Sequence, residues 1–64
     1  MNNKELIIEQ ARFCKTMLNR IVDDVERASI SIIYLEGHTR IQSDIIHLRR
    51  ELMRLSEMIG DARR

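Results

Sequence analysis

The side chains that could do chemistry in this chain are few, and their spacing forms no catalytic or metal-binding set. There is one cysteine, Cys14, and there are two histidines, His38 and His47. A nucleophilic thiol needs a nearby base and an electropositive setting, whereas Cys14 falls on an apolar stripe, which favours a small buried hydrophobe. Neither histidine has a partner at zinc-ligand spacing. We therefore expect no enzyme activity, no metal and no cofactor.

A second kind of chemistry is contact with a partner or an anion through one ring and several basic residues. Phe13 is the only phenylalanine, and it lies between Arg12 and Lys15. An exposed ring beside basic residues can stack on a base or fill a pocket of a partner protein. The basic residues further along the chain are Arg49, Arg50 and Arg54. Acidic residues such as Asp24 and Glu51 are interleaved with the basic residues of the two helices, which favours a solvated helix face over a surface that binds phosphates.

Length and charge narrow the class of protein. The 64 residues carry 33% charged side chains, but the formal net charge is only +1. Such a balance gives no strong reason to expect nucleic acid or an anionic membrane as partner. No apolar run is long enough to span a bilayer, and the first residues lack the apolar core of a signal peptide. We expect a cytoplasmic protein whose cysteine stays reduced.

Apolar residues recur with alternating spacings of four and three, the signature of helices that pack lengthwise. This apolar seam has one run on each side of a short break. Its first run is Ile7, Ala11, Cys14, Leu18, Ile21, Val25, Ala28, Ile32 and Leu35, and its second run is Ile41, Ile45, Leu48, Leu52, Leu55, Ile59 and Ala62. The pattern predicts an all-α fold made of two helices.

Capping residues and glycines set the expected boundaries. Nothing from residue 4 to residue 36 breaks a helix, and Gly37 suits the left-handed position that ends one. Thr39 can cap a second helix, which Gly60 would stop. We therefore predict a single domain over residues 1–64, with helix 1 at about 3–36, a turn at 36–39 and helix 2 at about 40–60. The β-branched stretch 29–34 leaves a strand followed by a hairpin loop as the alternative.

A turn of this length predicts an antiparallel hairpin. It would place Cys14 beside Ala62 and Ile21 beside Leu55, and helix 1 would extend beyond helix 2 by roughly 18 Å. The overhang holds Leu6 and Ile7, which one chain alone would leave exposed. Because many apolar side chains also flank the seam, we expect a second copy to complete a homodimeric four-helix bundle.

The segment from Ala11 to Thr16 reads Ala-Arg-Phe-Cys-Lys-Thr and resembles helix 1 of the Rop/Rom family, the small plasmid-encoded proteins that control copy number by binding RNA. Glu51-Leu52, Arg54 and Gly60-Asp61 are shorter similarities in helix 2. The resemblance implies a dimeric four-helix bundle with an outward Phe13. Of the family's RNA-contacting face only Phe13 carries over, because Glu9, Met17 and Asp24 stand where the family has amides and a lysine.

The sequence therefore favours a non-enzymatic regulatory or adaptor protein that works through helical protein–protein association. Two alternatives stay open: a Rop-like RNA-binding regulator, and a hairpin chaperone or inhibitor of a larger protein of the secretion or phage type. The expected oligomer interface consists of Ile7, Ala11, Cys14, Leu18, Ile21, Val25, Ile32, Ile45, Leu48, Leu52, Leu55 and Ile59. The expected partner or RNA contacts are Arg12, Phe13, Lys15, Arg49, Arg50 and Arg54.

Overall fold

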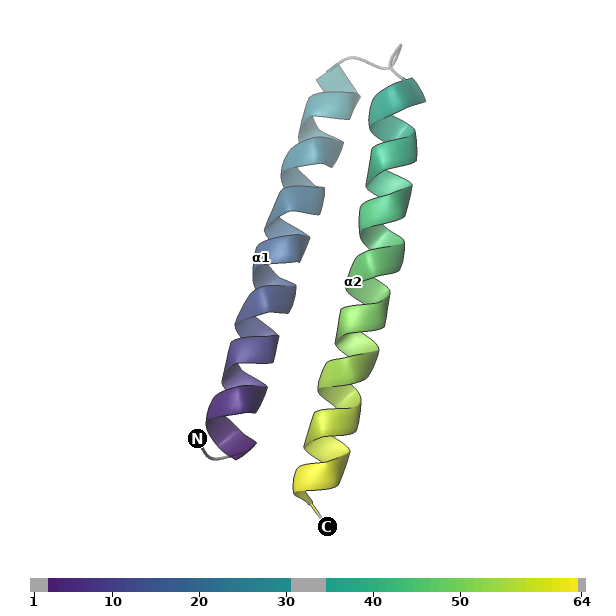
Figure 1. Cartoon of the computed structure of the whole chain (residues 1–64). Helices are drawn as coiled ribbons and strands as arrows, with labels where there is room; N and C mark the ends of the chain where they lie inside the picture. Colours follow the sequence, from purple (N-terminus) through teal and green to yellow (C-terminus); the bar gives the residue numbers. More distant parts are fainter. Residues whose placement is uncertain (1–2, 31–34, 64) are drawn as a thin grey trace.

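The chain folds into two helices that run side by side in opposite directions. A computed structural model describes residues 3–30 and 35–63, with helix α1 at Asn3–Ile30 and helix α2 at Leu35–Ala62. Each helix has 28 residues, and the two chain ends lie at the same end of the hairpin (Figure 1). The molecule is a rod of 49 × 15 × 13 Å. The all-α prediction is confirmed for the described part of the chain.

The predicted turn is in the wrong place. Helix α2 already begins at Leu35, so residues 36–39, which we expected to form the turn, belong to this helix. Glycine ends a helix only when it adopts the left-handed conformation, and it can also occupy an ordinary helical position at a modest cost in entropy. Gly37 takes the helical role. The predicted end of helix 1, residues 31–34, lies outside the described residues, and so does most of the alternative strand.

Gly60 is also inside α2 rather than beyond its end. The helix continues to Ala62, and no described glycine has a positive φ. The last turn closes with a hydrogen bond in which the Arg63 backbone N–H donates to the Gly60 carbonyl over 3.3 Å. A Cβ added to Gly60 would meet no other atom within 4 Å, so no steric requirement for glycine exists here.

The earlier start of α2 changes the register of the hairpin. Because α2 begins about five residues earlier than predicted, the pairing slides by roughly ten residues, or nearly three helical turns. Gln10 now contacts Glu51, and Ile7 lines a cleft with Met58. The predicted pairing of Cys14 with Ala62 is therefore wrong. The predicted overhang is wrong as well, because the two helices have equal length.

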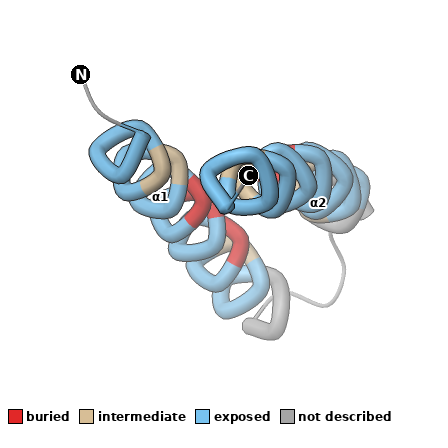
Figure 2. Tube along the Cα trace, turned by 90° about the horizontal axis from the view of Figure 1, so that it is seen from below, coloured by how far each residue is buried: buried red, intermediate tan, exposed pale blue. Residues whose placement is uncertain are grey.

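The side of each helix that faces the other is a row with spacings of three and four. We call this set the contact row. On α1 and α2 its buried or half-buried members are Ile7, Gln10, Cys14, Met17, Ile21 and Asp24, and Ile41, Asp44, Leu48, Glu51, Leu55 and Met58. Figure 2 shows that the buried positions of α1 lie along the side turned toward α2. Because the shift in register is close to a whole number of helical turns, each helix keeps the same side turned toward the other. Each residue on that side, however, meets a different residue of the other helix.

The core between the two helices is small. Among the side chains that the structure describes, Cys14, Met17, Ile21 and Leu48 form the buried apolar cluster, and none is less than 2% exposed. Typical core residues contact six or more neighbours from several directions, which two helices alone cannot provide. The hairpin therefore leaves much of its apolar surface without cover.

A polar contact crosses the middle of this small core. The Gln10 amide nitrogen Nε2 donates to the backbone carbonyl of Glu51 over 2.9 Å and to its carboxylate Oε1 over 3.2 Å. Glu51 is only 9% exposed. Since a buried carboxylate is costly without a hydrogen-bond donor, the pair ties one position of α1 to one position of α2 and thereby stabilises this register.

We expect the Gln10→Ala variant to be less stable than the wild type by about 1–3 kcal/mol, because it leaves buried acceptors of Glu51 without their donor. The free energy of unfolding from urea denaturation measures the effect. Gln42→Ala is the matched control, since Gln42 lies exposed on α2. Equal stabilities of the two variants would show that the contact with Glu51 does not hold the register.

We expect the Gly60→Ala variant to be more stable than the wild type by about 0.5–1 kcal/mol, because alanine restricts the unfolded chain and favours the helix. Thermal unfolding followed by circular dichroism measures this change. A loss of stability would mean that Gly60 adopts a left-handed conformation in solution and that α2 ends there.

Candidate interaction surfaces

The predicted oligomer-interface residues fall into two groups in the hairpin. Cys14, Ile21 and Leu48 are buried between the helices, and Ile7 and Leu55 are half-buried there. Ile32 lies outside the described residues. The remaining six are exposed on the hairpin: Ala11, Leu18, Val25, Ile45, Leu52 and Ile59. We call these six residues the apolar face.

Both helices turn the apolar face to the same side of the hairpin. Each of its members comes four residues after a contact-row residue, as Leu18 follows Cys14 and Leu52 follows Leu48. At 100° per residue, the face is rotated by about 70° from the direction of the other helix. In an antiparallel pair, positions with the same heptad placement lie on the same side. The large side chains of this face are 43–50% exposed, so a broad apolar surface is open.

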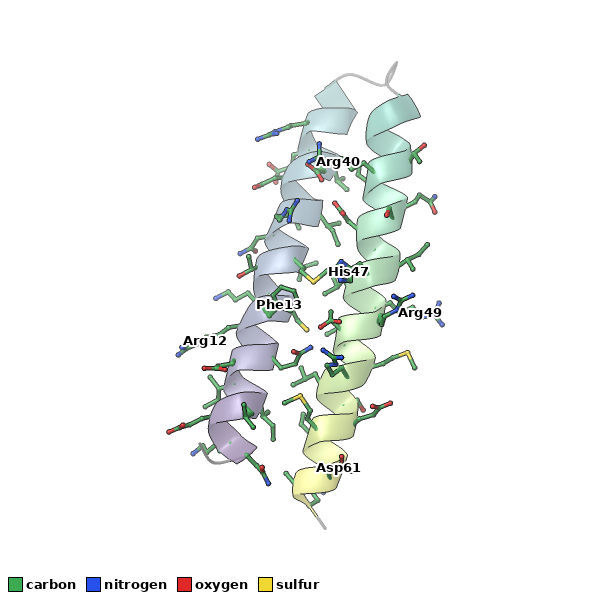
Figure 3. All side chains as sticks on the ribbon, in the orientation of Figure 1. Arg12, Phe13, Arg40, His47, Arg49 and Asp61 are labelled. Carbon is green, nitrogen blue, oxygen red and sulfur yellow. The ribbon has the colours of Figure 1, made fainter. Side chains whose placement is uncertain are left out.

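The opposite side of the hairpin carries clefts and polar groups. Phe13, Met17 and Arg20 from α1 line one cleft together with Asp44 and His47 from α2. Phe13 is 45% exposed, whereas Met17 beside it is buried. A second cleft near the chain ends is lined by Asn3, Leu6, Ile7, Met58, Asp61 and Ala62. We call this side of the hairpin the cleft side, and Figure 3 shows Phe13, His47 and Asp61 on it.

Carboxylates lie close to the arginines of the cleft side and offset part of their positive charge. The Arg54 guanidinium Nη1 lies 3.8 Å from Glu51 Oε1, although the Arg54 side chain is 67% exposed. Asp44 lines the same cleft as Arg20. Its Oδ2 atom is buried and has no hydrogen-bond partner among the described residues. Because each of these arginines has a carboxylate nearby, the surface offers less net positive charge than its arginines alone suggest.

The predicted partner or RNA contacts do not gather on one surface. Only Phe13 and Arg54 belong to the cleft side. Arg12 points away from α2 (Figure 3), and its carbonyl accepts a hydrogen bond from Thr16 Oγ1 over 3.1 Å. The other predicted contacts are exposed at helix positions that belong to neither face: Lys15, Arg49 and Arg50.

The structure brings to Phe13 two residues that are not among the predicted contacts, namely Arg20 and His47. Arg20 follows Phe13 by seven residues, which places both on one stripe of α1. That spacing was a usable signal. The proximity of His47 was not predictable, because it depends on the register between the helices.

Other kinds of site find no support in the described residues. No group of three or more His, Cys, Asp or Glu side chains is placed to hold a metal ion within residues 3–30 and 35–63. Neither described helix combines the length and apolar character that crossing a membrane requires. Cys14 is 5% exposed and lies in the core, far from the surface setting of a reactive thiol.

Comparison with protein-family models, curated proteins and solved structures finds no match for this chain. The resemblance of the segment around Phe13 to the Rop/Rom family therefore stays a prediction. The site has to be interpreted from its own geometry, with the apolar face and the cleft side as the two candidate surfaces.

We expect structured RNA to bind weakly, because the predicted basic residues point in different directions and acids lie under the cleft side. Binding that does occur should fall steeply with salt. A gel-shift titration of wild type and Phe13→Ala at about 0.15 M salt tests this. Tight binding that depends on the Phe13 ring would contradict the expectation and favour the Rop-like alternative.

Proposed function

We propose that the chain is a non-enzymatic helical adaptor that works as a homodimeric four-helix bundle, in which two hairpins meet through the apolar face. The single observation that carries the proposal is this face, where exposed apolar residues of α1 and α2 lie on one side of the hairpin. Monomeric proteins rarely leave a contiguous apolar surface of this kind in water. A second copy of the chain carries the same apolar face, so it offers an apolar surface that can cover the first.

Helix geometry supports a bundle of four. In a square bundle each helix has two neighbours at right angles, so the bundle axis lies about 45° from the direction of either one. On α1 that direction falls between Cys14 of the contact row and Leu18 of the apolar face. The predicted seam would then face the bundle axis. The contact row would meet one neighbour, and the apolar face would turn toward the second hairpin.

The surface area of the hairpin also supports a dimer. The accessible surface is 5680 Å² for a mass of 7.6 kDa, whereas a compact monomer of that mass exposes about 4,300 Å². A standard stable interface removes about 800 Å² from each partner. The excess surface of the hairpin is large enough to supply such an interface.

An adaptor needs a surface that remains free after assembly, and the cleft side meets this condition in the proposed bundle. It lies on the side of the hairpin opposite the apolar face, so in the dimer it would form the outer side of each hairpin. A protein partner fits this surface better than RNA, because acids lie beside its arginines. We place the activity in the cytoplasm, where the thiol of Cys14 would stay reduced.

We expect Leu52→Glu to weaken dimerisation at least tenfold, because the charge would be buried at the interface. Met53→Glu is the matched control: Met53 is the next residue and is 59% exposed, but it lies outside the apolar face. Sedimentation equilibrium over a range of micromolar concentrations compares both variants with the wild type. A monomeric wild type, or equal effects of the two substitutions, would contradict the proposal.

A further inference from the structure

The residues that border the apolar face carry charge of one sign. Each of them lies three residues before or four residues after a member of the apolar face, which places it about 50° further round its helix. We call this set the border, and its described members are Ile8, Lys15, Val22, Gln42, Arg49, Ser56 and Arg63. All are exposed, three are basic and none is acidic. Lys4, seven residues before Ala11, adds a further positive charge in line with the apolar face.

The acidic residues lie on the other sides of the two helices. Among the side chains that the structure describes, no aspartate or glutamate belongs to the apolar face or to its border. Asp24, Asp44 and Glu51 belong to the contact row, and Asp61 lies on the cleft side. The formal net charge of +1 therefore conceals a separation of charge, in which one side of the hairpin is both apolar and basic.

A second copy of the chain covers the apolar face but does not explain its basic border. Gln10 contacts Glu51, and this register places Lys15 and Arg49 within about 5 Å of each other along the hairpin. Two hairpins that meet through the apolar face would therefore bring basic residues together at the rim of the interface. Like charges at short distance repel each other, so the border suits a partner that carries negative charge.

We propose that the apolar face and its border also bind the surface of an anionic lipid bilayer, with both helices lying in the plane of the membrane. Helices that lie in this way place apolar side chains among the lipid chains and Lys or Arg among the headgroups. Anionic lipids of the cytoplasmic leaflet attract such basic residues. The proposal rests on the same face as the proposed dimer and adds a second occupant that competes with the second hairpin.

The arrangement of the side chains matches the layers of a bilayer surface. The large members of the apolar face are 43–50% exposed, and Ile8 and Val22 of the border are 39% and 43% exposed. All of them lie on one side of the hairpin, so both helices can enter the membrane surface together. Arg49 extends from α2 away from α1 (Figure 3). The stems of Lys15 and Arg49 can lie along the apolar side chains while their charged ends reach the headgroups.

A hollow at one end of the apolar face fits a single lipid. Its lining residues are Leu52, Leu55, Ser56, Ile59, Gly60 and Arg63. The leucine and isoleucine side chains provide an apolar wall for part of an acyl chain. Gly60 keeps the hollow open, because a Cβ added there would meet no atom within 4 Å. The guanidinium of Arg63 can bind the phosphate of the same lipid.

A bilayer suits this surface better than RNA does. RNA offers phosphates to the border, but it leaves the large apolar side chains between the basic residues without cover. A bilayer offers negative charge and an apolar layer at once. Bound in this way, the hairpin would turn its cleft side toward the water, where a protein partner of the adaptor could reach it.

The test measures binding of the full-length protein to lipid vesicles by flotation. Vesicles of phosphatidylcholine alone are compared with vesicles in which about one third of the lipid is phosphatidylserine. We expect at least tenfold stronger binding to the anionic vesicles, and weaker binding when the salt concentration rises from about 0.1 M to about 0.5 M. Sedimentation of the protein without vesicles reports its oligomeric state.

Two neighbouring arginines give a matched pair of variants. Arg49→Glu places a negative charge on the border and should weaken binding to the anionic vesicles at least tenfold, because each unit of charge at the surface changes binding about fivefold. Arg50→Glu changes the charge equally, but Arg50 lies about 100° further round the helix, on the side turned away from the apolar face. It should change binding less than about threefold. Circular dichroism confirms that both variants remain helical.

Tryptophan, which the chain lacks, reports which side enters the bilayer. Lipids with brominated acyl chains should quench the fluorescence of Leu18→Trp on the apolar face. They should not quench Ser43→Trp, at an exposed position outside the apolar face and its border. Contact between two copies of the chain produces no such quenching, so this measurement separates lipid binding from dimerisation.

Several results would overturn the inference. These are equal binding to neutral and anionic vesicles, no binding to either, equal effects of Arg49→Glu and Arg50→Glu, unquenched Leu18→Trp, and tighter, Arg49-dependent binding of a structured RNA. If the protein sediments as a dimer and does not bind vesicles, the bundle stands and the membrane site is wrong. If it binds anionic vesicles as expected but sediments as a monomer without them, the membrane site stands and the bundle is wrong.

Discussion

The structure depends on one constraint: each helix has an apolar arc wider than a single neighbouring helix can cover. The contact row of the hairpin buries Cys14, Met17, Ile21 and Leu48, and the same arc continues through Leu18 and Leu52, which are about half exposed. A chain of this size gains little stability from one small core. Additional burial against a second hairpin is the direct way to cover the remaining arc.

The sequence predicted the helices and their inward sides better than their ends. The heptad spacing correctly turned Cys14, Ile21 and Leu48 toward the other helix, because the spacing of apolar residues fixes the side a helix buries. The turn was misplaced because Gly37 is compatible with both a left-handed helix end and a position inside a helix. One ambiguous glycine was enough to shift the register by nearly three turns.

The contact row and the cleft side were harder to predict for the same reason. Gln10 and Glu51 are polar, so no hydropathy pattern marks them as inward residues, and their hydrogen bond exists only in the observed register. Phe13 was identified as a candidate contact from its type alone. Its neighbours Asp44 and His47 come from α2, 31 and 34 positions further along the sequence, and only the fold brings them to the ring.

NMR on a mixture of isotopically labelled and unlabelled protein tests whether two hairpins meet through the apolar face. Nuclear Overhauser effects that pass only between chains report which methyl groups touch in the assembly. If the hairpins meet through the apolar face, such signals come from the methyl groups of Leu18, Val25, Ile45 and Leu52, and none come from Ile46, which is 61% exposed and outside this face. No signals between chains, or signals that centre on Ile46, would contradict it.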